Sequence, residues 1–196
     1  MGKQSTMKTI AHILLLLLVT AVVSAQSGLN IYAGISNATS RDALITPEGT
    51  SHPGYVLGAD ARLNADDMYF MLGGQYHQID FLAQDEKSFF SVDEKMTWLK
   101  IRVGLGYNLV HIGNKITIRA KTLGSLNLIS STPELDSAPY SGTPYNSGTA
   151  GGVLGLGVDV FGLTMEVEYE RGFFNAVNQV EGTQYDFLIV TLGYFF

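Results

Sequence analysis

The sequence predicts an all-β fold, an eight-stranded antiparallel transmembrane up-and-down β-barrel, and three observations support this prediction. Eight segments alternate apolar with other side chains at a period of two over roughly ten residues, the length of a strand that crosses a membrane. The connections between them are alternately long and short. The last segment, residues 184–196 (QYDFLIVTLGYFF), resembles a barrel-closing strand and ends on an aromatic residue. A buried sandwich strand would fit this last segment equally well, so the other two observations favour the barrel.

The chain begins with the three parts of a secretory signal. Two lysines within the first eight residues precede an apolar run over residues 13–23, and the small residues Val-Ser-Ala end directly before Gln26. This run is shorter than the ~20 apolar residues that a membrane-spanning helix needs. We therefore expect residues 1–25 to be a signal peptide that is cleaved, and residues 26–196 to form the outer-membrane barrel domain.

The composition narrows the class of protein further. The sequence contains no cysteine, so neither a lipid anchor on cysteine nor a disulfide framework is available. Glycine is abundant, at 22 residues, and charged residues make up only 15%, which favours an all-β chain over a helical membrane protein. After residue 25, ten basic and 18 acidic residues remain, a net charge of −8 that argues against a nucleic-acid partner.

In chain order, we expect strands over residues 29–36, 55–63, 68–78, 97–109, 115–129, 149–161, 163–172 and 184–196. The connections at 64–67, 110–114 and 161–162 are tight turns, whereas the other four are long loops. Outer-membrane barrels show this asymmetry, with turns on the periplasmic side and loops facing outward. An even number of strands also places both chain ends on the turn side.

Charge-free rows on alternate positions predict a lipid-facing surface. Aromatic residues lie near both ends of these rows, as in the aromatic girdles of membrane barrels. The rows consist of Leu99, Ile101, Val103, Leu105, Tyr107, Ile116, Ile118, Ala120, Leu126, Leu128, Leu154, Leu156, Val158, Val160, Leu163, Met165, Val167 and Tyr169.

The opposite face carries the charges. A soluble barrel of the lipocalin type has its apolar face inside and its polar face outside, so alternation alone does not decide between the two. The export signal, the terminal Phe196 and the loop asymmetry favour the membrane, which places ten charged residues in the lumen. These are Asp60, Arg62, Lys100, Arg102, Arg119, Lys121, Asp159, Glu166, Glu168 and Glu170.

The distribution of these charges predicts a filled lumen. Basic residues lie on the fourth and fifth predicted strands, and the glutamates lie on the seventh. The interior of an eight-stranded barrel is just wide enough for side chains to fill, so we expect the basic side chains to meet the glutamates across the lumen. If the two charged walls stay apart instead, they line a narrow polar pore.

Residues 155–175 (GLGVDVFGLTMEVEYERGFFN) resemble the penultimate hairpin of the PorT-like outer-membrane β-barrel family of Bacteroidetes-type bacteria. In that hairpin a glycine-rich strand ending in an acidic residue turns into a strand ending in Tyr-x-x-Gly, followed by Asn. Residues 98–109 (WLKIRVGLGYNL) and the ending TLGYFF are similar to the middle and closing strands of the family. The resemblance implies an eight-stranded barrel of the size of the OmpA and OmpX barrels. Glu168 departs from the pattern, because an Arg often precedes the Tyr in the family.

The resemblance of the ending to outer-membrane closing strands also implies a role for Leu192, Tyr194 and Phe196 as the signal that the barrel-assembly machinery reads. The family suggests a non-enzymatic surface, binding or assembly component with an envelope or surface protein partner, embedded in outer-membrane lipid. The alternative is a narrow, porin-like channel for small solutes.

We expect no enzymatic activity and no cofactor. A hydrolase needs a hydroxyl nucleophile, a base and an orienting acid within reach of one another, and no Ser lies near His77 in the sequence. His77 is expected on the inner face, where it can pair with a carboxylate, and His52 is expected in a loop, solvated. Asp85, Glu86, Asp93 and Glu94 lack the regular spacing of a calcium-binding loop, so no metal is expected.

Overall fold

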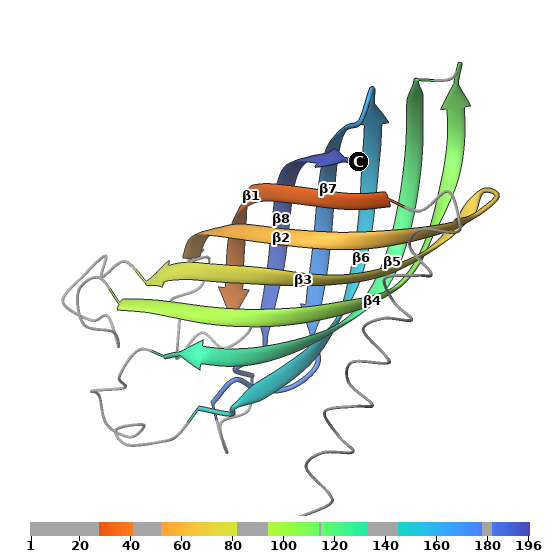
Figure 1. The fold of residues 1–196 in the computed structure, drawn as a ribbon. Helices are drawn as coiled ribbons and strands as arrows, with labels where there is room; N and C mark the ends of the chain where they lie inside the picture. Colours follow the sequence, from red (N-terminus) through yellow and green to blue (C-terminus); the bar gives the residue numbers. More distant parts are fainter. Residues whose placement is uncertain (1–27, 41–51, 82–93, 114, 133–144, 178–181) are drawn as a thin grey trace, which may run out of the picture.

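The computed structural model describes residues 28–40, 52–81, 94–113, 115–132, 145–177 and 182–196. Each strand pairs antiparallel with its neighbours in the chain, and β8 pairs with β1 to close the barrel (Figure 1). The predicted eight-stranded antiparallel barrel is therefore confirmed. The strands are β1 (Gly28–Ser40), β2 (His52–Ala65), β3 (Met68–Phe81), β4 (Glu94–Ile112), β5 (Ile116–Ser131), β6 (Gly148–Val160), β7 (Leu163–Gly172) and β8 (Tyr185–Phe195).

Several strands are longer than the sequence predicts. β4 runs for 19 residues, from Glu94 to Ile112, where alternation predicts only 97–109. The polar end of β1, from Asn37 onward, pairs with both β2 and β8. Hydrogen bonding on two sides holds these ends in the sheet even though their side chains have lost the apolar alternation. Among the described residues, none forms a helix long and apolar enough to cross a membrane.

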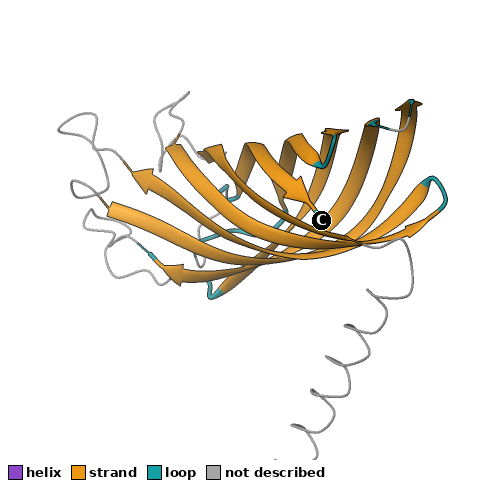
Figure 2. Ribbon diagram, turned by 45° about the horizontal axis from the view of Figure 1, so that its top comes forward, coloured by secondary structure: helices purple, strands orange, loops and turns teal. Residues whose placement is uncertain are grey.

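The short connections lie together at one end of the barrel (Figure 2). The turn after β2 has Asp66 at φ 55°, and the turn after β6 has Phe161 at φ 53° and Gly162 at φ 87°. Positive φ at both central residues, as at 161–162, is the geometry of a type I′ turn, which matches the twist of a two-residue hairpin. In the turn after β2, only Asp66 has positive φ. The tight turns predicted at 64–67, 110–114 and 161–162 are confirmed, because the strands that they join end and begin at Ala65 and Met68, at Ile112 and Ile116, and at Val160 and Leu163.

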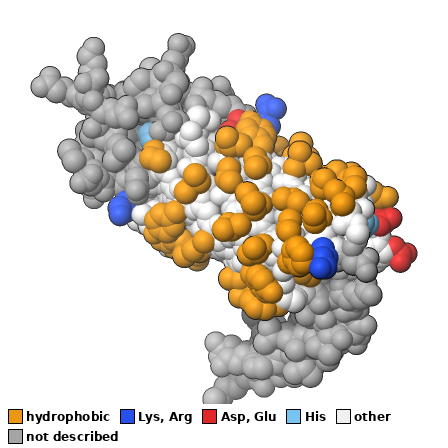
Figure 3. All heavy atoms as spheres, turned by 90° about the horizontal axis from the view of Figure 1, so that it is seen from above, with side chains coloured by type: hydrophobic (Ala, Val, Ile, Leu, Met, Phe, Trp, Pro, Cys, Tyr) orange, Lys and Arg blue, Asp and Glu red, His pale blue; other side chains and the backbone are white. Residues whose placement is uncertain are grey.

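Side chains alternate between the two faces in the order that a membrane barrel requires. Leu154 and Leu156 are 65% and 62% exposed on the outer face, whereas Arg102 on the inner face is 0% exposed. Figure 3 shows apolar side chains over the middle of one face of the barrel, with the few charged side chains in view toward its ends. The structure thus has the opposite arrangement to a lipocalin-type barrel, which has its polar face outside.

Candidate functional site

The ten predicted charged residues all point into the barrel, and we call this set the lumen charge ladder. It contains five basic and five acidic side chains. Nine of the residues are at most 4% exposed, and only the side chain of Asp159, at 22%, is partly open. Eight form one continuous set of ion pairs, and Lys100 and Glu170 form a separate pair beside it. The basic side chains of β4 and β5 are therefore in contact with the glutamates of β7.

At the turn end of the ladder, two arginines bind the same two carboxylates. Arg62 Nη1 donates to Asp159 Oδ2 over 3.0 Å, and Arg119 Nε donates to the same oxygen over 2.9 Å. Arg119 also donates to Glu166, and Arg62 Nη2 lies 3.3 Å from the same carboxylate. Asp159 and Glu166 thus share two guanidinium groups from opposite sides of the barrel, β2 and β5. Charge-assisted hydrogen bonds of this kind are stronger than neutral ones.

In the middle of the ladder, Glu168 is the shared partner. Arg102 donates to both of its oxygens, over 2.8 and 2.9 Å, in a bidentate pair. Lys121 contacts Glu168 and Glu166 together. Asp60 Oδ2 lies 3.7 Å from Arg102 Nη2, one of the two nitrogens that donate to Glu168. Glu168 therefore neutralises two buried cations from neighbouring strands, β4 and β5.

At the loop end of the ladder, Lys100 donates to Glu170 over 2.6 Å. Ser125 and Asn127 donate to the other oxygen of Glu170 over 2.8 and 2.9 Å. The Lys100 ammonium also lies 3.8 Å from the centre of the Phe187 ring. A carboxylate with three donors is well satisfied, and the cation–π contact marks the point where the charged section of the lumen meets an aromatic one.

Glycines on β6 bring the basic residues of β5 to the glutamates of β7. Lys121 pairs in register with Gly155, which pairs with Glu168. A Cβ atom on Gly157 would lie only 2.9 Å from Arg119 Cζ. Because these glycines leave space above β6, Arg119 and Lys121 reach over it. The expectation that the basic side chains of β4 and β5 cross the lumen is therefore wrong for these two, and it holds for Lys100 and Arg102, which reach Glu170 and Glu168 on β7.

Above the ladder, on the loop side, the lumen is filled by an apolar cluster that the sequence did not predict, and we call it the outer apolar plug. Trp98 and Phe187 meet edge to face at 5.5 Å between ring centres, and both are at most 3% exposed. Ala176 and Val177, from the connection after β7, are buried in the same cluster. The plug consists of Ala38, Val56, Ile79, Met96, Trp98, Ala176, Val177, Tyr185, Phe187 and Ile189.

Backbone hydrogen bonds hold the connection after β7 in the barrel mouth. Asn146 N–H donates to Ala176 O over 2.8 Å, and Ala176 N–H donates to Thr183 O over 3.1 Å. Tyr145 and Val177 form an isolated antiparallel bridge. The plug is therefore built partly from strands and partly from two connections that cover them.

Two expectations about histidines are wrong. Among the side chains that the structure describes, His77 pairs with no carboxylate; its Nε2 lies 2.7 Å from Ser36 Oγ. His52 is not a solvated loop residue, because it is the first residue of β2 and is only 6% exposed. Ser36 and His77 lie 41 residues apart, so only the register of β1, β2 and β3 brings them together. His77 packs 4.7 Å from Phe187, so the Ser–His pair lies inside a packed interior rather than at a cleft.

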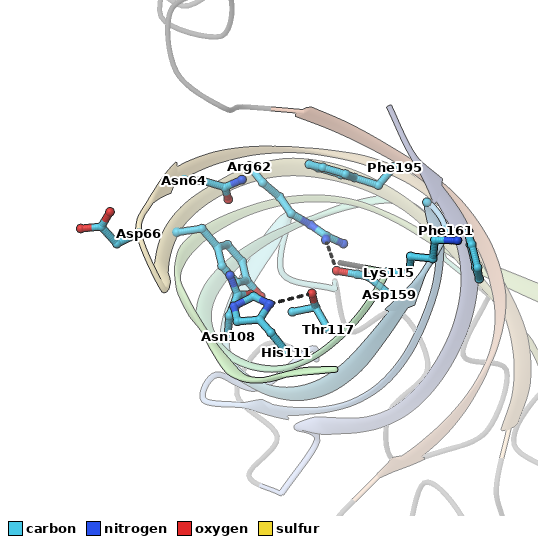
Figure 4. A pocket seen from close by; sticks show the side chains of 12 residues that line it. Arg62, Asn64, Asp66, Asn108, His111, Lys115, Thr117, Asp159, Phe161 and Phe195 are labelled. Atoms are coloured by element: carbon cyan, nitrogen blue, oxygen red, sulfur yellow. Dashed lines mark hydrogen bonds and ion pairs between the residues drawn. The ribbon is translucent and has the colours of Figure 1, made fainter. Parts of the chain in front are cut away.

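Below the ladder, on the turn side, a cavity of about 550 Å³ opens into the barrel (Figure 4). Its walls combine charged, amide and aromatic side chains, and the Arg62–Asp159 ion pair is its floor. Asp66 points away from it. The cavity is lined by Arg62, Asn64, Asp66, Tyr69, Asn108, His111, Lys115, Thr117, Asp159, Phe161, Gly162 and Phe195.

The predicted assembly signal lies on the outer face. Leu192, Tyr194 and Phe196 are 57%, 45% and 69% exposed. The rings of Tyr194 and Phe196 meet at 4.9 Å, and Phe196 N–H donates to Leu29 O over 2.9 Å. The three side chains therefore form an outward row at the seam between β8 and β1.

Other predicted features fall outside the described residues. The signal peptide, Asp85, Glu86 and Asp93 are among them. Within the part of the chain that is described, no three His, Cys, Asp or Glu side chains are arranged to hold a metal ion.

Three solved structures of bacterial proteins match this chain. Neisserial surface protein A matches with a TM-score of 0.56 at 14% identity, over 88% of this chain and 98% of that one. The Yersinia pestis outer membrane protein Ail matches at 0.46 and 13%, over 87% and 99%. The β-barrel domain of Pseudomonas aeruginosa OprF matches at 0.41 and 10%, over 85% and 97%. The likeness to the Neisserial protein shows a shared fold. No family model and no curated protein matches the sequence.

Proposed function

We propose that this chain is a non-enzymatic integral protein of the bacterial outer membrane, exported by residues 1–25. Its closed barrel presents surface loops and acts as a surface, binding or assembly component. The resemblance to PorT-like barrels supports this class of role and an envelope protein as partner. The distribution of side chains supports the membrane location.

One observation carries the membrane location: large apolar side chains are exposed on the outer face of all eight strands. Examples are Ile35 at 69%, Leu126 at 59% and Leu192 at 57%. Soluble monomers rarely expose contiguous apolar patches of more than a few hundred Å². In a bilayer these apolar side chains contact hydrocarbon instead of water, so their exposure carries no free-energy cost, and the buried charges stay paired inside the barrel.

A charge on the outer face tests this location. In vesicles, Leu154→Arg at mid-strand should lower the free energy of unfolding by about 2–4 kcal/mol, the cost of an arginine near the bilayer midplane. The matched control is Leu128→Arg near the loop end, which should cost about 0–1 kcal/mol. Equal, small effects at both positions would contradict a membrane location, as would recovery of the wild type in the soluble periplasm.

The closed lumen supports a scaffold rather than a channel. The lumen charge ladder joins β2, β4, β5, β6 and β7 across the middle of the barrel, and the outer apolar plug fills the loop side. Water that enters the turn-side cavity therefore meets the paired Arg62 and Asp159. The small-solute channel remains the alternative, with the ladder as its lining.

Planar-bilayer recording separates the two functions. We expect wild-type protein to give no stable single-channel steps, and Glu168→Ala to give openings because Arg102 and Lys121 lose their shared partner. Stable steps in the wild type would establish the channel instead. Crosslinking in intact outer membranes then tests the scaffold: a stable protein partner supports it.

The barrel-assembly machinery is the partner proposed for the last strand. Because the Phe196 side chain is 69% exposed, Phe196→Ala should refold in vitro with wild-type yield. In cells it should give little assembled, heat-modifiable barrel and more degraded protein. An unchanged cellular yield would mean that Phe196 is simply another apolar residue of the outer face.

A further inference from the structure

The β6–β7 turn contains a residue that its backbone geometry disfavours. Phe161 has φ 53° and precedes Gly162 at φ 87°. A bulky side chain in the left-handed region is strained, and the favoured pair for a type I′ turn is Asn-Gly or Asp-Gly. The only other described non-glycine residue with positive φ is Asp66, of a type that tolerates it. Phe161 therefore occupies a position that its local backbone geometry disfavours.

The surrounding backbone fixes the strained turn in place. Phe161 N–H donates to Lys115 O over 3.1 Å, and Phe195 N–H donates to Gly162 O over 2.8 Å. The turn is thereby tied both to the β4–β5 turn and to the end of β8. Strained residues persist where neighbouring structure determines their conformation, and they gather at functional sites.

Protein packing does not account for the aromatic ring. Phe161 is 65% exposed, and its one recorded ring contact is with a cation: Lys115 Nζ lies 4.7 Å from the ring centre. Figure 4 shows the two residues together at the rim of the turn-side cavity. Within the described part of the chain, Lys115 has no carboxylate within ion-pair distance. The turn thus presents an exposed aromatic ring beside an uncompensated positive charge.

We propose that Phe161 and Lys115 form a binding site for a phospholipid headgroup in the periplasmic leaflet. This inference rests on the proposed outer-membrane location. Leu163, directly after the turn, is 52% exposed and belongs to the apolar outer face, so Phe161 lies at the edge of that face. Aromatic rings are enriched at this depth of a bilayer, and a lysine there reaches the lipid phosphate. Lipid contact compensates for the strain of the turn.

The test compares one substitution in two environments. Phe161→Asn creates the favoured Asn-Gly turn, so in octyl glucoside micelles, which contain no phosphate, the folded-to-unfolded ratio should rise about fivefold or more. In vesicles of phosphatidylcholine with phosphatidylglycerol, the same substitution should lower that ratio severalfold. The matched control is Asp66→Asn in the other two-residue turn. Its effect on the folded-to-unfolded ratio should have the same sign in micelles and in vesicles.

Lys115→Gln isolates the charge. It should leave stability in octyl glucoside unchanged and lower it in the phosphatidylglycerol-containing vesicles, by less at high salt. A change of the same sign for Phe161→Asn in both environments, or equal effects of Lys115→Gln in both, overturns the headgroup site. Failure of the wild type to insert into vesicles overturns the membrane location itself, so the two failures are distinguishable.

Discussion

The lumen charge ladder and the outer apolar plug fill the same barrel by different means. In the ladder, Glu168 has two named partners, Arg102 and Lys121, and each position requires a particular charge. In the plug, Trp98 touches several apolar neighbours, and no single contact is indispensable. Each buried charge needs a partner of opposite sign, because an unmatched buried charge is costly in free energy. Apolar packing requires only that side chains fill the available volume.

The difference predicts how each region responds to damage. A ladder residue should be rescued by removing its partner, since a buried ion pair replaced by apolar groups is often neutral in stability. A plug residue should have no such rescue, because a second truncation enlarges the cavity. Four substitutions test this contrast, in order of expected effect.

Glu168→Ala should be the most damaging. Arg102 and Lys121 keep their charges and lose a shared carboxylate, and an uncompensated buried charge costs about 3–5 kcal/mol. Denaturant unfolding of the vesicle-inserted protein measures the loss. The double variant Lys121→Met with Glu168→Met should be more stable than Glu168→Ala alone, because Arg102 keeps its contact with Asp60. Glu166 also keeps Arg62 and Arg119 as partners. A less stable double variant would remove the distinction between the two regions.

Trp98→Ala should lower the free energy of unfolding by on the order of 3 kcal/mol, because it leaves a cavity in the plug. The side chain is 2% exposed. Adding Phe187→Leu should lower the free energy of unfolding further, again measured by denaturant unfolding in vesicles. Recovery of stability in this double variant would show that the plug contains specific pairs after all.

Gly157→Ala should cost about 2 kcal/mol, since the new methyl group overpacks the space that the Arg119 guanidinium occupies. Gly124→Ala is the matched control, because its Cβ would meet only Val103 O at 3.9 Å. The difference between the two unfolding free energies measures the cost of filling the space above β6 that Arg119 occupies. Equal values would show that Arg119 has another place to lie.

Ser36→Ala should have the smallest effect, about 1 kcal/mol, the value of one buried hydrogen bond. It removes the 2.7 Å contact to His77 and leaves the ring packed against Phe187. The same unfolding experiment measures it. A loss as large as that of Glu168→Ala would mean that the Ser–His pair belongs with the charged section of the lumen.

The period of two placed every ladder residue on one face, and the export signal, the terminal Phe196 and the loop asymmetry together indicated that this face is the inner one. It did not reveal the pairing, because reaching over β6 depends on Gly155 and Gly157, whose role is visible only in register with β5 and β7. The contact between Ser36 and His77 was unpredictable for the same reason, since strand register joins residues far apart in the chain.

The plug had a partial signal in the sequence. Met96, Trp98 and Phe187 occupy inner-face positions, so continuing the alternation past the charged residues would have indicated an apolar section of the lumen. Ala176 and Val177 had no such signal. They lie in a connection without periodicity, and only backbone hydrogen bonds place them in the barrel mouth.

The distribution of the ladder along the chain bears on the order in which the barrel is completed. The basic residues of β4 and β5 number four, and the acidic residues of β6 and β7 also number four, while Asp60 and Arg62 cancel within β2. If strands are added in chain order, a sheet that ends at β5 carries an excess of four positive charges on its inner face. β6 removes one, and β7 brings the three glutamates that remove the rest. Electrical neutrality of the interior is reached only at the penultimate strand, one step before β8 meets β1.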